Sequence, residues 1–293
     1  MIFGVPLQAL LGQLLLGLIN GAFYAMLSLG LALIFGLLNI INFTHGALYM
    51  AGAFAAWLVL TYLGIGYWGA LLLAPLAVGL FGMLLERFLL SRLYKLDHLY
   101  GLLLTFGLAL VIEGGFRQLY GVSGMPYPVP KELQGGWNLG VMYLPIYRGW
   151  VVVVSASVCL GTWLLVEKTK LGSYLRAATE NRALVQAFGI NVPMMVTLTF
   201  GFGVALAALA GVLAAPIYSV NPLMGSNLII VVFAVVVIGG MGSMGGAIIT
   251  SFALGLVEGL TKLLYPEAAS TIIFLVMAVL LLVKPAGLFG KER

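Results

Sequence analysis

Long apolar runs, separated by short polar or glycine-rich stretches, fill this chain from end to end. Breaks at proline, glycine and charge clusters divide it into nine apolar segments, near residues 9–36, 45–62, 68–86, 99–120, 149–166, 194–216, 227–239, 246–262 and 269–284. A helix needs about 20 residues to cross the hydrocarbon of a bilayer. Segment 227–239 is too short to cross alone and is predicted to be a half-helix or a re-entrant piece. The pattern therefore predicts eight spans, or nine if this segment also crosses.

The composition places these segments in a membrane. Hydrophobic residues make up 62% of the 293 residues and charged residues 8%, and the mean hydropathy is +1.14. Soluble proteins are roughly half apolar and about a quarter charged. No Asp, Glu, Lys or Arg precedes Glu86, and no charge-rich domain is appended. We predict an all-α, polytopic helical membrane protein with broken or re-entrant helices, whose single domain covers residues 1–293.

The basic residues predict the orientation. Ten of the fourteen lie in regions that segment counting places on one side: Arg87, Arg92, Lys95, Lys168, Lys170, Arg176, Arg182, Lys284, Lys291 and Arg293. Cytoplasmic loops carry an excess of Lys and Arg, so this side is predicted to be cytoplasmic, with the N-terminus outside and the C-terminus inside. The first residues, MIFGVPLQ, lack the basic region of a cleaved signal peptide. A pI near 9.3 without a basic run indicates membrane orientation rather than nucleic-acid binding.

The sequence contains few groups that could catalyse a reaction. It has no G-x-x-x-x-G-K-[ST] motif to hold a nucleoside triphosphate. His45 and His98 are the only histidines and lack metal-ligand spacing, and the lone Cys159 lies in an apolar run where packing is its expected role. No catalytic residue, metal site or cofactor is predicted on this chain, so an intramembrane enzyme lacks a candidate catalytic group.

Two acidic residues are candidates for intramembrane carboxylates. Glu113 precedes Arg117 by four positions, and Glu258 precedes Lys262 by four. Glu followed by a cation at i+4 is the favourable helical pairing. Both are predicted to be helix-end ion pairs that anchor at the interface. Little is left to drive ion coupling, so energy is expected to enter from elsewhere.

Two apolar segments are interrupted, at residues 36–56 and 237–255. In each, a helix stops at polar or glycine residues and another begins at Gly-Ala. Asn42, Thr44 and Ser243 are predicted to be the N-caps of the second pieces. Glycine-broken segments in opposite halves are typical of a transport path built from half-helix ends. Ordinary turns between spans are the alternative interpretation, and the two are compatible.

Glycines four positions apart recur along the chain. The pairs Gly17/Gly21, Gly242/Gly246 and Gly255/Gly259 have the small-xxx-small spacing that permits close helix contact. Tight packing, within the chain or against another chain, is expected.

One polar segment stands between the apolar runs. Six charged residues fall within residues 167–182, and Ala-rich residues 172–188 predict a helix that Gly189 can end. The helix is too polar to span and lacks the strong apolar face of a membrane-surface helix. A short helix offered to another protein is the main interpretation, and a generic surface helix is the alternative.

Four stretches of the chain resemble the LivH-type permease subunits of the high-affinity branched-chain amino acid ABC transporter family. They are NIINFTHGALYM (Asn39–Met50), LGSYLRAATENRALVQAFGIN (Leu171–Asn191), GMGSMGGAIITSFALGLVEGL (Gly240–Leu260) and KPAGLFG (Lys284–Gly290). They occur in the right order over nearly the whole chain. The second resembles the cytoplasmic coupling segment of ABC permeases, although Asn181 stands after Glu180 where an Asp is frequent.

The resemblance implies a subunit of an ATP-driven importer in a bacterial inner membrane. The partners would be a second homologous permease subunit, two cytoplasmic ABC ATPases that carry ATP and Mg²⁺, and a periplasmic or lipid-anchored substrate-binding protein. The cargo would be leucine, isoleucine and valine. The coupling segment would cover about residues 167–192.

The resemblance also assigns candidate sites. The residues that would contact an ATPase are Gly172, Arg176, Ala177, Glu180, Asn181, Arg182, Ala183, Phe188, Gly189 and Ile190. The two interrupted segments, rather than the resemblance, supply the candidates that would line a translocation path: Asn42, Thr44, His45, Gly46, Gly242, Ser243 and Gly246. Half-helix N-termini at these positions would favour the carboxylate of an amino acid. A structural role for these residues, and for His45 a capping or core hydrogen-bonding role, is the alternative.

Two other readings stay open. The same machinery could carry urea, short amides, other amino acids or sugars, since urea permeases share an INxxHG-type motif. A stand-alone channel or secondary carrier would need no ATPase partner.

Overall fold

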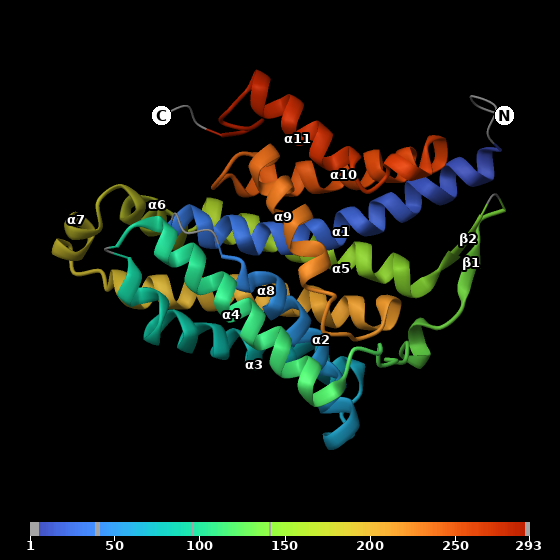
Figure 1. The fold of residues 1–293 in the computed structure, drawn as a ribbon, viewed down its shortest axis with the longest axis horizontal. Coiled ribbons are helices and arrows are strands. Elements are labelled where there is room, and N and C mark those ends of the chain that lie inside the picture. Colours follow the sequence, from blue (N-terminus) through green and yellow to red (C-terminus); the bar gives the residue numbers. More distant parts are fainter. Residues whose placement is uncertain (1–5, 39–41, 95, 141, 291–293) are drawn as a thin grey trace. The chain divides into compact units, whose positions relative to one another are not determined.

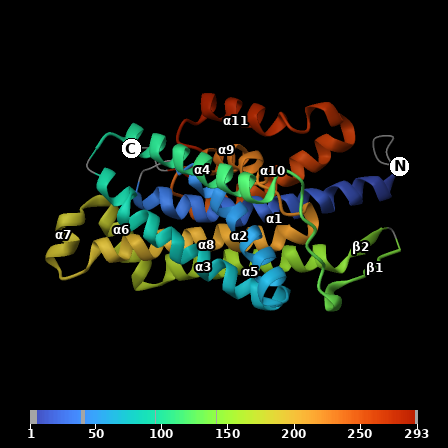
Figure 2. The same ribbon diagram turned by 60° about the horizontal axis from the view of Figure 1, so that its bottom comes forward.

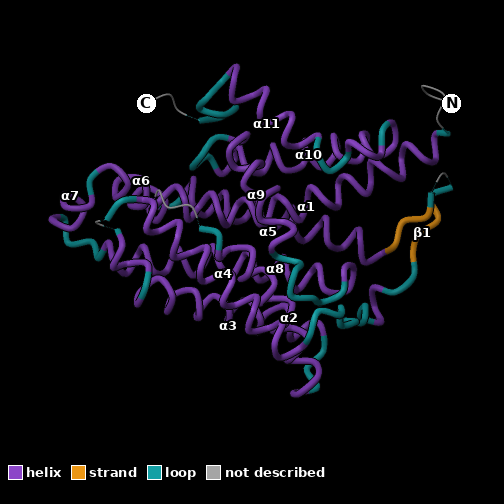
Figure 3. The backbone as a smooth tube through the Cα atoms, viewed as in Figure 1, coloured by secondary structure: helices purple, strands orange, loops and turns teal. Residues whose placement is uncertain are grey.

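The computed structural model describes residues 6–38, 42–94, 96–140 and 142–290 (Figure 1). Most of these described residues are helical, and their strands are confined to one short hairpin (Figure 3). The α-helices are α1 (Leu7–Leu38), α2 (Thr44–Leu63), α3 (Tyr67–Phe88), α4 (His98–Tyr120), α5 (Ile146–Lys168), α6 (Lys170–Glu180), α7 (Arg182–Ala187), α8 (Val192–Tyr218), α9 (Ser226–Gly239), α10 (Met244–Leu264) and α11 (Ile272–Val283). The 3₁₀ helices are η1 (Leu90–Leu93), η2 (Lys131–Leu133) and η3 (Pro266–Ala268).

Seven of the described helices are long and apolar enough to cross a membrane: α1, α2, α3, α4, α5, α8 and α10. This confirms the predicted all-α, polytopic class. Helix α9 has 14 residues and is short, as predicted. The last apolar segment differs from the prediction, because its helix α11 has only 12 residues. Residues 266–268 form η3, and a turn occupies the positions before Ile272.

The structure divides into two compact units. The α10 unit comprises Met1–Ser28, Val129–Leu160 and Val231–Arg293, and the α8 unit comprises Leu29–Pro128 and Gly161–Ile230. The α10 unit contains the hairpin of β1 (Gly136–Asn138) and β2 (Tyr143–Pro145), which pair antiparallel. The hairpin lies within the proline- and glycine-rich loop between α4 and α5.

In the α10 unit, glycines bring α1 and α10 into backbone contact. A Cβ atom added at Gly17 would lie 3.1 Å from the Cα of Leu256, and one added at Gly255 would lie 2.7 Å from the Cα of Gly21. Glycine permits this approach because it has no side chain to separate the helices. The predicted close packing of Gly17/Gly21 and Gly255/Gly259 is therefore confirmed, and it occurs within the chain.

In the α8 unit, α8 is largely buried and packs against both α2 and α3, which also contact each other (Figure 2). A Cβ added at Gly52 of α2 would lie 2.7 Å from the carbonyl carbon of Ala208. On the α3 side, a Cβ at Gly82 would lie 2.8 Å from a methyl group of Val204. Close-packed helices of this kind transmit displacement, because protein interiors leave few voids to absorb it.

Candidate functional site

The polar segment forms two short helices rather than the single helix predicted for residues 172–188. Helix α6 ends at Glu180, and α7 begins at Arg182. The reason is Asn181, whose backbone is extended (φ −147°, ψ 94°) and whose side chain accepts a hydrogen bond from the backbone N–H of Leu184 at 3.0 Å. Asn favours this N-cap role over a helix interior. Gly189 ends the segment as predicted, with φ 82°.

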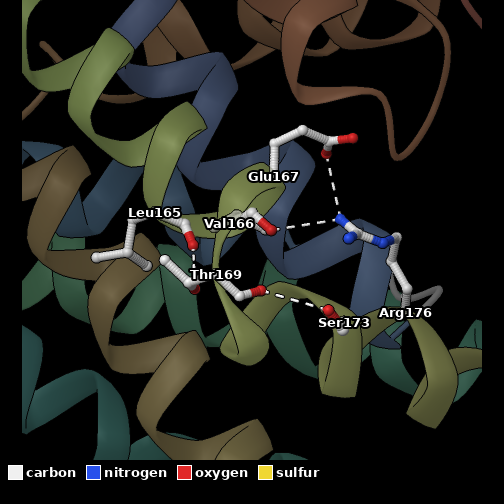
Figure 4. Close-up of polar contacts among 6 residues, drawn as sticks. All are labelled: Leu165, Val166, Glu167, Thr169, Ser173 and Arg176. Carbon is white, nitrogen blue, oxygen red and sulfur yellow. Dashed lines mark hydrogen bonds and ion pairs between the residues drawn. The ribbon is translucent and has the colours of Figure 1, made fainter.

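Helix α6 is held against the end of α5. The Arg176 guanidinium donates to the carbonyl oxygen of Val166 at 3.3 Å and forms an ion pair with Glu167 at 3.2 Å (Figure 4). The Val166 carbonyl belongs to the last turn of α5, where carbonyls lack intrahelical partners. Gly172 lies against the same carbonyl group. Arg176 is thus engaged within its own chain, although half of its side chain stays exposed, and its predicted contact with an ATPase stays a prediction.

The segment has a buried side and an exposed side. Leu175, Ala178 and Val185 are buried. The exposed side carries most of the residues predicted to contact a partner: Ala177, Glu180, Asn181, Ala183, Phe188 and Gly189. Phe188 is 78% exposed and Leu184, four positions before it, is 55% exposed. Leu184 is absent from the sequence-based candidates, although its i, i+4 spacing with Phe188 was a usable signal.

A buried carboxylate lies next to this segment, at the end of α3. Glu86 is 2% exposed. One carboxylate oxygen accepts from the hydroxyl of Tyr94 and the other from the hydroxyl of Thr197 in α8, both at 2.5 Å. Burial, and then the hydrogen bond to Glu86, raise the pKa of Tyr94 above its usual value, so its phenol stays a donor. Sequence reasoning missed this cluster because Thr197 lies 111 positions from Glu86.

Arg182 joins α7 to the cluster. Its guanidinium carbon lies 5.3 Å from the centroid of the Tyr94 ring, within the range of a cation–π interaction. Arg182 is the first residue of α7, so the second half of the polar segment contacts the membrane helices through Tyr94. Arg182 was predicted to contact an ATPase, and the structure adds this contact within the chain.

The two acidic residues chosen from the sequence both form the predicted ion pairs. Glu113 lies 3.4 Å from Arg117, and Glu258 lies 2.5 Å from Lys262. Glu258 is the more buried, and in the α10 unit it also accepts from Tyr24 at 2.8 Å and from Asn20 at 3.3 Å. It therefore joins α1 to α10 in addition to pairing within its own helix.

The start of α2 differs from the predicted capping. The N-cap position is Phe43, and no side chain caps this helix, so the capping roles predicted for Asn42 and Thr44 are wrong. Thr44 instead donates to the carbonyl oxygen of Thr105 in α4 at 2.7 Å, because the packed helix offers it a closer acceptor. Asn42 is 1% exposed, and neither polar atom of its side chain has a hydrogen-bond partner among the described residues.

His45 and Gly46, which follow Thr44 in α2, are closely packed. His45 is fully buried beside Gly30 of α1. A Cβ at Gly46 would lie 2.7 Å from the carbonyl oxygen of Gly225, just before α9. The start of α2 is therefore fixed by backbone contact inside the α8 unit.

The start of α10 matches its prediction. Ser243 accepts from the N–H of Gly246 at 3.1 Å and caps the helix. Gly240 and Gly242 have φ of 98° and 84°, which glycine adopts at little cost. The tail covers this turn: the N–H groups of Leu288 and Phe289 donate to the last carbonyls of α9 at 2.8 and 3.2 Å. A Cβ added at Gly240 would lie 2.8 Å from the Cα of Gly290, so two of the four recognised motifs contact each other.

Some predictions concern residues elsewhere. Asn39, Ile40 and Ile41 of the first motif lie outside the described residues, as do Lys95, Lys291 and Arg293 of the basic clusters. Asn42, Thr44, His45 and Gly46 belong to the α8 unit, whereas Gly242, Ser243 and Gly246 belong to the α10 unit. A path shared by the two groups stays a prediction.

Comparison with known families agrees with this architecture. Residues 13–283 match the family described as "Branched-chain amino acid transport system / permease component". The chain belongs to this family. Membership makes it a membrane-spanning permease component of the ABC type, a transport subunit and not an enzyme.

Several curated relatives are similar over most of their length. The permease protein BraD of Pseudomonas aeruginosa is 29% identical, with 97% of this chain and 96% of BraD covered. LivH of Escherichia coli K12 is 27% identical, with the same coverage. LivM of the same organism is 29% identical over 92% of this chain and 68% of LivM. All three are named as permease proteins of the high-affinity branched-chain amino acid transport system.

Proposed function

We propose that this chain is one membrane subunit of an ATP-driven importer that carries leucine, isoleucine and valine, delivered by an external binding protein. The observation that carries the proposal is similarity along nearly the whole chain to permeases named for branched-chain amino acid transport. The seven long apolar helices supply the membrane domain that such a subunit needs.

The importer requires other chains. We assign ATP and Mg²⁺ to two cytoplasmic ABC ATPases, because this sequence has no phosphate-binding loop. A second, homologous permease subunit is supported by similarity to both LivH and LivM, which carry different names in one organism. A periplasmic or lipid-anchored binding protein would deliver the cargo. The whole would act in a bacterial inner membrane, and this chain would contribute one integral domain to it.

Helices α6 and α7 would dock on an ATPase through their exposed side. Leu184 and Phe188 offer an apolar pair, flanked by Ala177, Glu180 and Ala183. At many interfaces a few side chains that fill a partner's pocket dominate the energetics, and aromatic side chains are prominent among them. The buried side of the segment fixes its position on the α8 unit.

The charge distribution supports a cytoplasmic position for this segment. The contacts of Arg182 with Tyr94 and of Tyr94 with Glu86 place the loop after α3 and the polar segment at the same end of the α8 unit. Both carry basic residues, which the positive-inside rule assigns to the cytoplasm. The N-terminus would then lie outside and the C-terminus inside.

The start of α2 is the place where we expect the cargo's polar groups to be accommodated. A buried amide without a hydrogen-bond partner is costly, and Asn42 has both of its polar atoms in that state among the described residues. Irregular backbone at membrane depth is tolerated where it faces protein or a water-filled cavity. An amino-acid carboxylate or ammonium passing Asn42 would supply the missing partner.

The experiment is co-purification of the tagged chain from its native membrane, with partners identified by mass spectrometry. Recovery of two ATPases, a second permease and a binding protein is expected, together with leucine binding by that binding protein. A binding protein selective for urea or another amino acid would keep the machinery and change the cargo. A chain recovered alone that transports in liposomes would overturn the proposal in favour of a channel or carrier.

A variant pair tests the docking face. Phe188→Ser should lower ATPase recovery at least tenfold, because it removes the most exposed aromatic group of the segment. Leu63→Ser, at the last residue of α2 and 66% exposed, is the matched control and should leave ATPase recovery unchanged. Equal recovery in both variants would exclude Phe188 from the contact.

A further inference from the structure

We propose that Glu86, Tyr94 and Thr197 form the mechanical link through which α7 moves the membrane helices α3 and α8. They act as positioning residues, not as contacts of cargo or ATP. The inference rests on the proposed function, because it assumes that an ATPase displaces the polar segment.

The first contact of the link lies between α7 and Tyr94, the residue that directly follows η1. Arg182 begins α7, and its guanidinium is placed over the Tyr94 ring at 5.3 Å from the centroid. Arg182 is partly buried, which strengthens a cation–π contact relative to an exposed one. A displacement of α7 therefore displaces Tyr94.

The second contact passes from Tyr94 into two membrane helices at once. The Tyr94 hydroxyl donates to one oxygen of Glu86 in α3, while the other oxygen accepts from Thr197 in α8. Both bonds are short at 2.5 Å, as expected for hydroxyl donors to a carboxylate. The carboxylate is 2% exposed, so water does not replace these donors easily.

Beyond Glu86 and Thr197, α3 and α8 are packed so closely that we expect them to move together. A Cβ at Gly79 would lie 3.1 Å from the carbonyl oxygen of Gly201, and one at Gly201 would lie 2.6 Å from the terminal methyl of Met83. Helices in such contact cannot slide past each other without a clash. A pull on Glu86 therefore moves both helices together.

The packed pair of α3 and α8 also contacts α2. Helix α8 contacts α2 where Gly52 faces Ala208 and Gly211 faces Tyr49. Asn42, which we expect to meet cargo, lies two residues before α2. The link thus connects the docking segment to the proposed transport path by contacts within a single unit.

A purely structural role is the competing interpretation, because a buried carboxylate with two donors also stabilises a fold. The two roles differ in what a mild variant changes. Loss of a stabilising bond lowers the amount of folded importer. Loss of a link leaves the importer assembled and hydrolysing ATP while less cargo moves per ATP.

The test uses the complete importer, with its ATPases and binding protein, in proteoliposomes. Tyr94→Phe removes the hydroxyl donor and keeps the ring under Arg182, and Glu86→Gln keeps the shape of the acceptor. Each should keep ATPase recovery and basal hydrolysis near wild type and lower leucine uptake per ATP about tenfold, the loss expected for one hydrogen bond to a charged group. Tyr100→Phe, at an exposed tyrosine of α4, is the matched control and should leave leucine uptake per ATP unchanged.

The double variant Tyr94→Phe/Glu86→Gln should lose less coupling than the sum of the two single losses, because both substitutions act on the bond between Tyr94 and Glu86, while only Glu86→Gln also disturbs the bond to Thr197. Unchanged uptake per ATP in Tyr94→Phe would overturn the link. Equal loss of assembly and uptake would also overturn it, since that outcome belongs to a structural contact. If the wild-type complex contains no ATPase, the proposed function itself fails, which is a separate result.

Discussion

Two buried glutamates show how different a carboxylate's role can be in one membrane domain. Glu258 in the α10 unit has a cation four residues away and two further donors on α1. Glu86 in the α8 unit has two hydroxyl donors, one on α8 and one on the loop that receives Arg182. The first carboxylate joins one pair of helices. The second joins a pair of helices to the exposed polar segment.

The two glutamates are expected to differ in role: Glu258 stabilises the fold, and Glu86 couples ATP hydrolysis to transport. The partners of Glu258 all lie on α1 and α10, whose backbones already touch at glycines. The partners of Glu86 lie between elements that would have to move when a partner protein acts on α7. Changes near Glu258 should therefore lower the amount of folded protein, and changes near Glu86 should lower transport per ATP.

The largest effect is expected where α1 meets α10. Gly17→Leu should prevent folding, because even a Cβ there would lie 3.1 Å from the Cα of Leu256 and three more carbons would have no space. Gly12→Leu, five positions earlier on the same helix, has nothing within 4 Å of an added Cβ and is the matched control. The measurement is the yield of monodisperse protein in mild detergent. Equal yields from the two variants would contradict the packing described for the α10 unit.

The next effect concerns Glu258 itself. Glu258→Ala should lower the free energy of unfolding by about 2 kcal/mol, because Tyr24 and Lys262 lose a buried acceptor. Glu113→Ala removes a more exposed ion pair and should cost about 0.5 kcal/mol or less. Thermal unfolding in detergent compares the two. If Glu113→Ala lowered the free energy of unfolding as much as Glu258→Ala, the buried ion pair would contribute no more stability than the more exposed one.

A smaller effect is expected at the serine pair of the same interface. Ser28 and Ser251 share a hydrogen bond of 2.8 Å between α1 and α10. Ser28→Ala should cost about 1 kcal/mol or less, which is typical of interhelical hydrogen bonds in membranes, and should leave uptake per ATP unchanged. Ser157→Ala, at an exposed serine bonded to its own helix, is the control for stability. Reduced coupling in Ser28→Ala would show that the α10 unit shares the role we assign to Glu86.

Local signals in the sequence account for what could be predicted. The seven long helices follow from apolar length, and the Glu258–Lys262 pair and the Gly17/Gly21 contact follow from i, i+4 spacing. Ser243 was found as a cap because it directly precedes its helix. Each of these features depends on residues a few positions apart.

Features that depend on tertiary contact could not be predicted. Glu86 stands at the end of an apolar segment, and nothing near it in sequence indicates Thr197 as a partner. Thr44 looked like a cap, but the packed α4 offers it a carbonyl acceptor instead. Asn181 was noticed only as a departure from a family pattern, although its capping preference was enough to indicate the break between α6 and α7.

The most direct test is a cross-linking experiment that compares the polar segment linked to Glu86 with the end of α10 near Glu258. In a Cys159→Ala background, Leu184→Cys places a thiol on α7, and Tyr265→Cys places one just after α10 near Glu258, at a position 60% exposed. A cysteine-directed photo-cross-linker in the assembled importer should join position 184, and not position 265, to an ATPase subunit. If position 265 is joined to an ATPase, or if neither position is, the assignment of coupling to the polar segment linked to Glu86 is contradicted.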